Sequence, residues 1–257
     1  MNQARIFFLI IFSTCLLIAC SGNTTAGSGK DTTSNISATP GSGDDLYYEL
    51  ATKSTGKNFS MSSVTKISVS SKGEVRKEMN MTNSFSGKVH SSEIVVIANS
   101  DTPDESIIIN DAEKTYTKNH IDRNGNSTGE KIQSTITKVG DEKILGFNCV
   151  HVRIISTETL GTLSSHTDTL DIWKSNEVPM LSKFKQMMDK FEPKTEALIF
   201  STKVADQLKQ MGCEGFVVKI EVKGKDASTT TVLTKVEQRT IPAGMFQIPS
   251  GYKEDKS

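Results

Sequence analysis

From residue 46 onward, short apolar runs alternate with clusters of glycine, asparagine, aspartate and serine. The clearest alternation sets Lys219 and Glu221 against four apolar residues at every second position: Phe216, Val218, Ile220 and Val222. Successive side chains of a strand point to opposite faces, so this segment is predicted to be a strand with one solvated face. Apolar runs at 94–97, 106–109 and 149–155 are expected to be strands as well.

Turn-forming residues follow several of these runs at short distance. Residues 224–227 separate the first predicted strand from a second at 230–236, and residues 110–113 separate 107–109 from 115–117. Parallel neighbours need long crossovers, whereas turns of this length join antiparallel strands. The pattern therefore predicts a mainly β domain built as an antiparallel meander.

Two segments follow the helical period instead. Between Pro179 and Phe191, large apolar residues recur on one helical face: Met180, Phe184, Met187, Met188 and Phe191. A second, weaker helix is expected from Thr202 to Met211, where Gly212 would end it.

Three of the five residues on the first helical face are methionines. Methionine side chains are unbranched and adaptable, and they recur on surfaces that accommodate variable apolar partners. Two interpretations stay open. The helix either packs on the sheet as part of a filled core, or it roofs an apolar groove that takes a ligand.

The first twenty residues have the pattern of an export signal. Arg5 precedes an apolar run from Ile6 to Ala19, which is typical of a secretory signal and too short to span a bilayer. The run ends in LIAC at residues 17–20, which matches the lipobox of bacterial lipoproteins. This match implies that residues 1–19 are a signal peptide, that the Ala19–Cys20 bond is cleaved, and that Cys20 becomes acylated. Its acyl chains would then hold the protein on a membrane.

Residues 20–45 contain no aromatic side chain and are mostly small or polar. Such a segment cannot bury enough apolar surface to offset the entropy lost on ordering. We expect a flexible linker with an end-to-end distance on the order of 25–30 Å. The folded domain is expected over residues 46–253, followed by a polar tail at 254–257.

Charge narrows the range of partners. Loss of Arg5 with the signal peptide leaves 29 Lys and Arg against 30 Asp and Glu, a net charge of −1. There is no basic surplus to attract phosphate backbones, which argues against nucleic acid as a partner. Ser21 follows the lipidated cysteine where an aspartate would favour inner-membrane retention under the enterobacterial sorting rule. We therefore expect an outer-membrane location facing the periplasm.

No catalytic motif can be recognised. His90, His120, His151 and His166 lack the paired spacing of metal-binding motifs, and GxSxG, P-loop and dinucleotide fingerprints are absent from the sequence. We expect a non-catalytic protein without a cofactor or metal.

Two cysteines remain in the mature domain. In an exported chain, Cys149 and Cys213 are compatible with a disulfide, and two separate buried thiols are the alternative. His151 shares a strand face with Cys149, but a stable zinc site needs three or four ligands. Asp168 and Asp171 are three residues apart on a strand-like segment, so we expect them on opposite faces, as solvated charges or turn caps.

Several short motifs resemble those of a known family. They are YYEL at 47–50, GFNC at 146–149, DIW at 171–173 leading to VP at 178–179, and IPAGMFQIPSGY at 241–252. Over roughly residues 46–253 the chain resembles the DUF4412 family of Bacteroidetes-type lipoproteins, which is similar to the LolA/LolB-like group. The resemblance implies a strongly curved antiparallel sheet, or incomplete barrel, with the two helices over its concave face. In the lipoprotein carriers of that group, this cavity receives acyl chains.

Our leading hypothesis is a membrane-anchored envelope lipoprotein whose half-barrel binds an apolar ligand, such as an acyl chain or the lipid of a lipoprotein. The alternative is a structural or protein-interaction module with a filled core. An open apolar cavity beneath residues 180–191 would favour the first.

The closing motif is expected to be structural. Pro249 cannot donate to a strand ladder, so a final strand should end near Ile248. Phe246 and Ile248 would then share one face and point into the core. Tyr252 is expected to pack its ring while its hydroxyl reaches water or a backbone carbonyl.

Overall fold

The computed structural model describes residues 43–120, 131–160, 164–178 and 207–255. Its strands and its 3-10 helix η1 follow in chain order as β1 (Asp45–Gly56), β2 (Phe59–Val69), β3 (Glu74–Phe85), β4 (Lys88–Asn99), β5 (Thr102–Asn110), β6 (Thr115–His120), β7 (Lys131–Ile144), β8 (Phe147–Leu160), β9 (Ser164–Ser175), β10 (Phe216–Lys223), β11 (Ala227–Arg239), η1 (Ala243–Phe246) and β12 (Lys253–Glu254). A short helical turn occupies residues 207–210.

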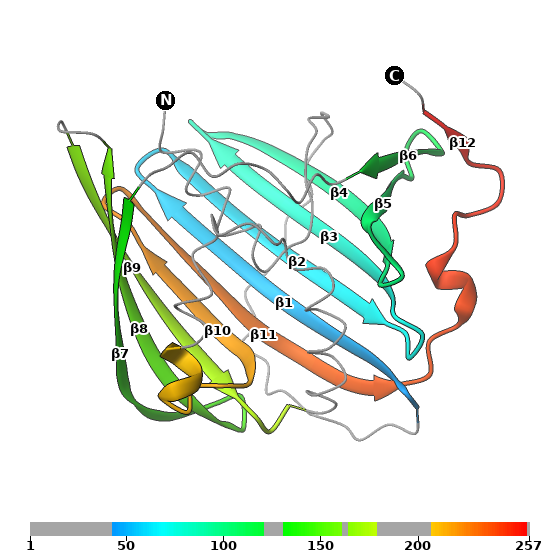
Figure 1. Ribbon diagram of the computed structural model, residues 1–257. Coiled ribbons are helices and arrows are strands. Elements are labelled where there is room, and N and C mark those ends of the chain that lie inside the picture. Colours follow the sequence, from blue (N-terminus) through cyan, green and yellow to red (C-terminus); the bar gives the residue numbers. More distant parts are fainter. Residues whose placement is uncertain (1–42, 121–130, 161–163, 179–206, 256–257) are drawn as a thin grey trace.

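All twelve strands belong to one sheet, in the order β12-β6-β5-β4-β3-β2-β1-β11-β10-β9-β8-β7 (Figure 1). Strands β1 to β6 and β7 to β11 form two antiparallel meanders, which are joined where β11 pairs with β1. The short β12 lies parallel to β6. The predicted meander is confirmed, including the hairpins β5–β6 and β10–β11.

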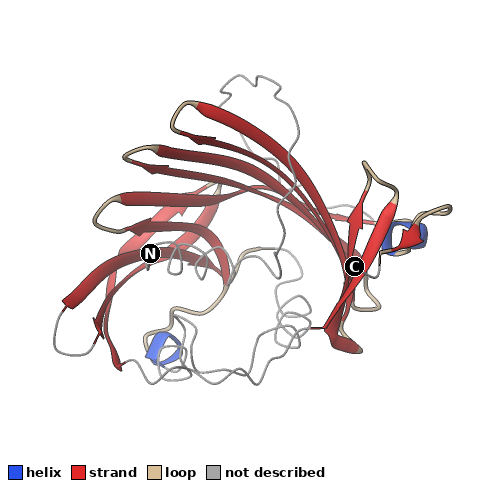
Figure 2. Ribbon diagram, turned by 90° about the horizontal axis from the view of Figure 1, so that it is seen from above, coloured by secondary structure: helices blue, strands red, loops and turns tan. Residues whose placement is uncertain are grey.

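The sheet is strongly curved and does not close (Figure 2). Register shifts in β1 and β10, at Glu49/Leu50 and Val217/Lys219, contribute to this shape because a bulge bends its strand and increases the local twist. The turn at 207–210 lies on the hollow side of the sheet (Figure 2). Of the two helices predicted over the concave face, the segment 179–191 lies outside the described residues. The second is described only at 207–210, so the two-helix arrangement is not supported.

The helical turn identifies the inner face of the sheet. Leu208 and Cys213 pack against a cluster from three neighbouring strands that includes Val152, Ile172 and Ile220. These side chains therefore point into the hollow. Because strand side chains alternate between faces, Asp171 and the other residues between them point to the outer face.

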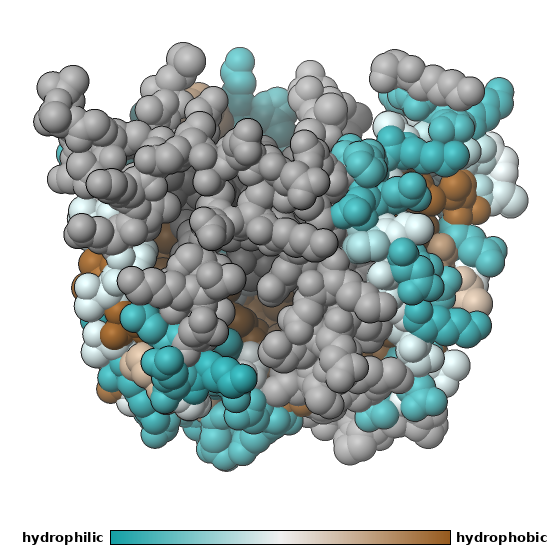
Figure 3. All heavy atoms as spheres, viewed as in Figure 1, coloured by the Kyte–Doolittle hydropathy of each residue, from teal (hydrophilic) through white to brown (hydrophobic). Residues whose placement is uncertain are grey.

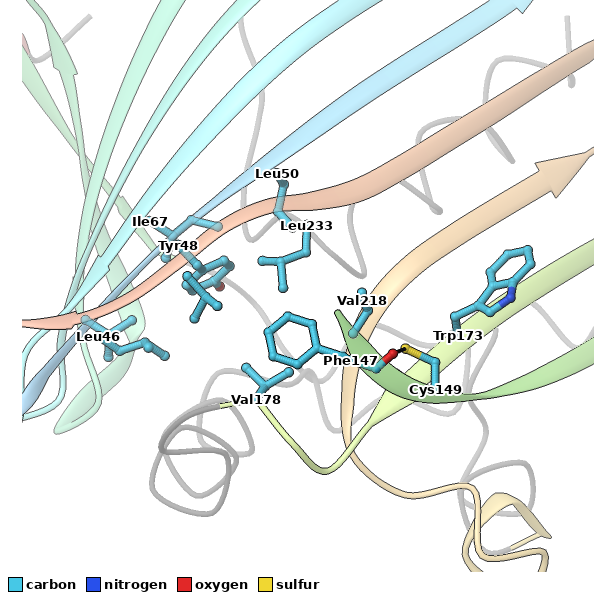
Figure 4. Packing of buried hydrophobic residues seen from close by; sticks show 12 residues of the cluster. Leu46, Tyr48, Leu50, Ile67, Phe147, Cys149, Trp173, Val178, Val218 and Leu233 are labelled. Atoms are coloured by element: carbon cyan, nitrogen blue, oxygen red, sulfur yellow. Dashed lines mark hydrogen bonds between the residues drawn. The ribbon is translucent and has the colours of Figure 1, made fainter. Parts of the chain in front are cut away.

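The largest buried cluster is centred on β1, β2 and β11 (Figure 4). It contains Leu46, Tyr48, Leu50, Ile67, Val69, Phe147, Cys149, Trp173, Val178, Val218, Leu233 and Val236. The Tyr48 ring meets the Phe216 ring edge to face, with 5.5 Å between ring centroids. This geometry is favourable for aromatic pairs and joins β1 to β10.

The start of β1 is held by one buried carboxylate. Asp45 accepts hydrogen bonds from the backbone N–H of Ser71 at 2.7 Å and of Ile241 at 2.8 Å. These two donors lie in the β2–β3 turn and in the segment after β11. Asp45 therefore joins three segments that are far apart in sequence.

The closing segment differs from the prediction in three respects. Residues 243–246 form η1 instead of a strand, with Phe246 buried as predicted but Ile248 only partly buried. The Tyr252 ring packs against a cluster of Val95, Ile97 and Ile109, but its hydroxyl donates to Asp111 Oδ1 instead of water or a backbone carbonyl. The segment covers the outer face of β3 to β6 and is structural in this respect.

Gly215 is expected to be irreplaceable where β9 meets β10. Its φ is +119°, and a Cβ there would lie 2.5 Å from the carbonyl oxygen of Ser175. Gly215→Ala should lower the free energy of unfolding by more than about 1 kcal/mol, measured by urea denaturation. Gly140→Ala is the control, because a Cβ at Gly140 meets nothing within 4 Å. Equal stability of the two variants would contradict this packing.

Candidate functional site

The side chains on the inner face change from aliphatic to hydroxyl-bearing from one side of the sheet to the other. One cross-strand row runs through Val152, Ile172, Ile220, Thr231, Thr52, Ser63 and Met81. The adjacent row runs through Ile154, Leu170, Val222, Thr229, Ser54 and Met61. Strands β8 to β10 thus form an aliphatic wall, β11, β1 and β2 form a hydroxyl strip, and methionines follow on β2 and β3.

The hydroxyl strip consists of Thr52, Ser54, Ser63, Thr65, Thr229 and Thr231. Thr52 Oγ1 lies 3.0 Å from Thr231 Oγ1, and Ser54 Oγ lies 2.8 Å from Thr229 Oγ1. These cross-strand pairs satisfy one another without introducing charge. The strip therefore remains compatible with an uncharged ligand, and in each pair the hydroxyl that accepts keeps its own O–H as a donor.

Apolar side chains are visible near the middle of this face, whereas the described residues at its lower margin are mostly hydrophilic (Figure 3). The sequence-predicted groove residues Met180, Phe184, Met187, Met188 and Phe191 lie outside the described residues. Ala19 and Cys20 also lie outside them.

The two domain cysteines are free thiols, and both are buried. Cys149 belongs to the cluster around Phe147, whereas Cys213 packs with Leu208 on the inner face. Burial raises the pKa of both thiols, which keeps them protonated. The structure therefore has the separate buried thiols and not the disulfide.

The outer face of β8, β9 and β10 carries a polar lattice of six residues in two paired rows. One row is His151, Trp173 and Lys219, and the other is Arg153, Asp171 and Glu221. The His151 ring stacks on Trp173 with 4.2 Å between centroids, and Lys219 Nζ lies 4.2 Å from the Trp173 ring centroid. The indole Nε1 donates to Glu142 Oε2 on β7 at 2.7 Å.

Asp171 is the buried centre of this lattice, with 2% of its surface exposed. Arg153 donates to both carboxylate oxygens, at 2.8 and 3.1 Å, and His151 Nε2 donates to Oδ1 at 2.9 Å. Burial alone would raise the pKa of Asp171, but the hydrogen bonds and charges of Arg153 and His151 outweigh it and lower that pKa. The carboxylate is therefore ionised, and both of its oxygens accept hydrogen bonds.

This lattice corrects the sequence interpretation of Asp171 as a solvated charge or turn cap. Asp168 and Asp171 do alternate onto opposite faces, as the spacing predicted. The partners of Asp171 come from β8, and only the strand register reveals them. Within the described ranges, no group of three or more His, Cys, Asp or Glu side chains is placed to hold a metal ion. The contacts of the lattice join β8 to β9 and β9 to β10 on the outer face.

Comparison with known proteins then assigns the chain to a family. The family described as "Domain of unknown function (DUF4412)" matches residues 50–252, which is more than half of the 257 residues. The chain belongs to this family. The DUF4412 match begins within β1 and ends at Tyr252, so it includes both meanders and the closing segment.

Solved structures similar to this DUF4412 chain include LprF from Mycobacterium bovis, with 10% identity, a TM-score of 0.34, and coverage of 80% of this chain and 90% of that chain. A putative outer membrane lipoprotein-sorting protein domain from Vibrio parahaemolyticus has 9% identity, a TM-score of 0.31, and coverage of 79% and 89%. A putative lipoprotein from Parabacteroides distasonis has 13% identity, a TM-score of 0.27, and coverage of 80% and 100%. No curated protein matches.

In the part of the chain that the structure describes, no helix is long and apolar enough to cross a membrane.

Proposed function

We propose that this DUF4412 protein is a lipoprotein of the cell envelope that binds an apolar ligand, an acyl chain or the lipid of a lipoprotein, against the inner face of its sheet. The observation that carries the proposal is the aliphatic wall of β8 to β10 beside an uncharged hydroxyl strip. Cys20 would supply the membrane anchor, with the domain at the outer membrane facing the periplasm.

The inner face suits a lipid for two reasons. Its aliphatic wall removes methylene groups from water, which contributes about 0.8 kcal/mol for each buried CH₂. The neighbouring hydroxyls can donate to an ester or carboxyl oxygen at the end of the chain. The alternative is a filled core over this face, which would make the domain a structural or protein-interaction module.

A charge within the hydroxyl strip should block this ligand. Thr231→Lys places an ammonium group in the hydroxyl strip, where an unpaired charge against an apolar ligand is strongly unfavourable. Binding of the methyl ester of a fluorescent long-chain fatty acid, which has no carboxylate to pair with the lysine, should weaken at least about tenfold in a titration, which corresponds to about 1.4 kcal/mol. Thr230→Lys is the matched control, because it makes the same change on the outer face of β11.

Thermal unfolding of both variants shows whether they remain folded. If the unmodified protein binds no fatty-acid ester, or if the two lysine variants lose binding equally, the inner face is not the ligand site and the module interpretation holds.

The anchor has its own test. Cys20→Ala should move the protein from the membrane fraction to the soluble fraction, because the thiol that carries the diacylglyceryl group is gone. Immunoblots of carbonate-washed membranes measure this shift. A Cys20→Ala protein that stays in the washed membranes would show that the lipid assignment is wrong.

A further inference from the structure

Two hairpin tips lie side by side at one end of the sheet. The turn of β1–β2 and the turn of β3–β4 are joined by a hydrogen bond from the Ser86 N–H to the Asn58 carbonyl at 3.1 Å. Directly beside it, Phe59 and Phe85 are cross-strand partners. We call this end, formed by Lys57, Phe59, Phe85, Lys88 and Val89, the hairpin rim.

The hairpin rim exposes apolar side chains that the fold does not require. Phe85 is 63% exposed and Val89 is 47% exposed. The turn between them depends on Ser86 and Gly87, whose φ values of +50° and +80° are typical of a tight two-residue hairpin. Because these two residues form the turn, the exposed Phe85 ring is not needed for it.

The same rim carries exposed lysines. Lys57 and Lys88 lie in the two joined hairpins, and Lys225 lies in the neighbouring β10–β11 turn together with Asp226. Aromatic and aliphatic side chains beside lysines suit the interface of an anionic bilayer, where the ring enters the headgroup region and the ammonium groups meet lipid phosphates.

We infer that the hairpin rim is a contact surface for an anionic phospholipid membrane. This inference rests on the anchor in the proposed function, because an acylated Cys20 keeps the domain close to a bilayer and raises its effective concentration. The linker that follows Cys20 joins β1 at the end opposite the hairpin rim. A fully extended chain of the 24 residues from Cys20 to Gly43 would span about 75–80 Å, whereas β1 spans about 40 Å, so the rim can turn to the membrane.

Contact at this rim would also bring the bilayer to the inner face. Phe59 alternates with Met61 and Ser63 along β2, and Ser63 belongs to the hydroxyl strip. Phe85 pairs with Phe59 and therefore lies on the same face. The two phenylalanines thus continue the inner face out to the membrane contact, which is where an acyl chain would enter.

Vesicle flotation with the mature chain from Ser21 onward, made without acylation, tests this inference. It retains every described element. Vesicles of phosphatidylglycerol with phosphatidylethanolamine should bind it at least tenfold more tightly than phosphatidylcholine vesicles. Phe85→Ser with Val89→Ser should weaken binding at least tenfold. Lys57→Gln with Lys88→Gln should weaken it on the order of tenfold, because each lysine near an anionic surface contributes to binding.

The controls carry the same changes elsewhere. Val64→Ser alters a 41% exposed valine away from the rim, and Lys72→Gln with Lys114→Gln removes two exposed lysines from other turns. Unchanged binding by these control variants, with unchanged melting temperatures for all variants, supports the hairpin rim as the membrane contact. Equal loss in the controls, or no binding to anionic vesicles, overturns it. Binding of the fatty-acid ester is measured in parallel. A failed rim with intact ester binding leaves the proposed function standing, whereas vesicle binding without ester binding leaves the rim standing.

Discussion

Phe246→Ala is expected to lower the free energy of unfolding by about 3–5 kcal/mol, the usual range for removing a buried aromatic ring. Phe246 is 7% exposed and lies in η1, which packs against β3. Arg76 on β3 donates through Nη1 to the Met245 carbonyl at 3.2 Å, so the ring and this hydrogen bond together fix the closing segment to the outer face. Urea denaturation followed by circular dichroism measures the change.

Gln247→Ala is the control for this prediction, because Gln247 is the exposed neighbour of Phe246 and should change stability by no more than about 0.5 kcal/mol. A Phe246→Ala protein with unchanged stability but lost ligand binding would contradict the packing role and would place Phe246 in the ligand site.

Asp171→Ala is expected to cost about 2–3 kcal/mol of stability. The substitution removes the acceptor of three hydrogen bonds and leaves the buried side of Arg153 without its partner. The cost is below that of a fully buried ion pair, because the Arg153 side chain is 43% exposed and can reach water. Asp141→Asn is the control, since that carboxylate is 70% exposed in a surface pair and should contribute little.

The pH dependence of this effect has a defined sign. The pKa of Asp171 is lowered in the folded state, so its contribution is fully present above the ordinary unfolded value of about 3.9 and is lost as the pH falls through the folded pKa. The stability difference between the unmodified protein and Asp171→Ala should therefore be constant from about pH 8 to pH 5 and shrink below about pH 4. A difference that vanishes near neutral pH would contradict the assigned ionisation.

The meander could be predicted because its signals are local. Alternation from Phe216 to Val222 and the turn at 224–227 describe β10 and β11 without any tertiary information. The lattice around Asp171 could not be predicted from the sequence. The register of β8 and β9 brings His151 and Arg153 to Asp171, and that register depends on the whole sheet.

The closing segment was mispredicted for a related reason. Phe246 and Ile248 alternate as a strand would, but Pro242 and Gly244 precede them and favour the tight turns of η1. The Tyr252 hydroxyl bonds to Asp111, which is distant in sequence, so local reasoning could only offer water or backbone as its partner.

The hydroxyl strip was missed although its signal is present in the sequence. Thr52 and Ser54, Ser63 and Thr65, and Thr229 and Thr231 are each spaced two apart, so each pair shares a strand face. What the sequence could not supply is the pairing of β11 with β1, which connects residues about 180 positions apart and makes one strip of three strands.

Native mass spectrometry of the protein purified from cell envelopes tests the central claim most directly. The acylated protein should carry an additional, non-covalent mass of one acyl lipid, which collisional activation removes, and Thr231→Lys should lack it while Thr230→Lys keeps it. A spectrum that contains only the covalently acylated chain, in both the unmodified protein and the Thr230→Lys control, would contradict a lipid-binding inner face.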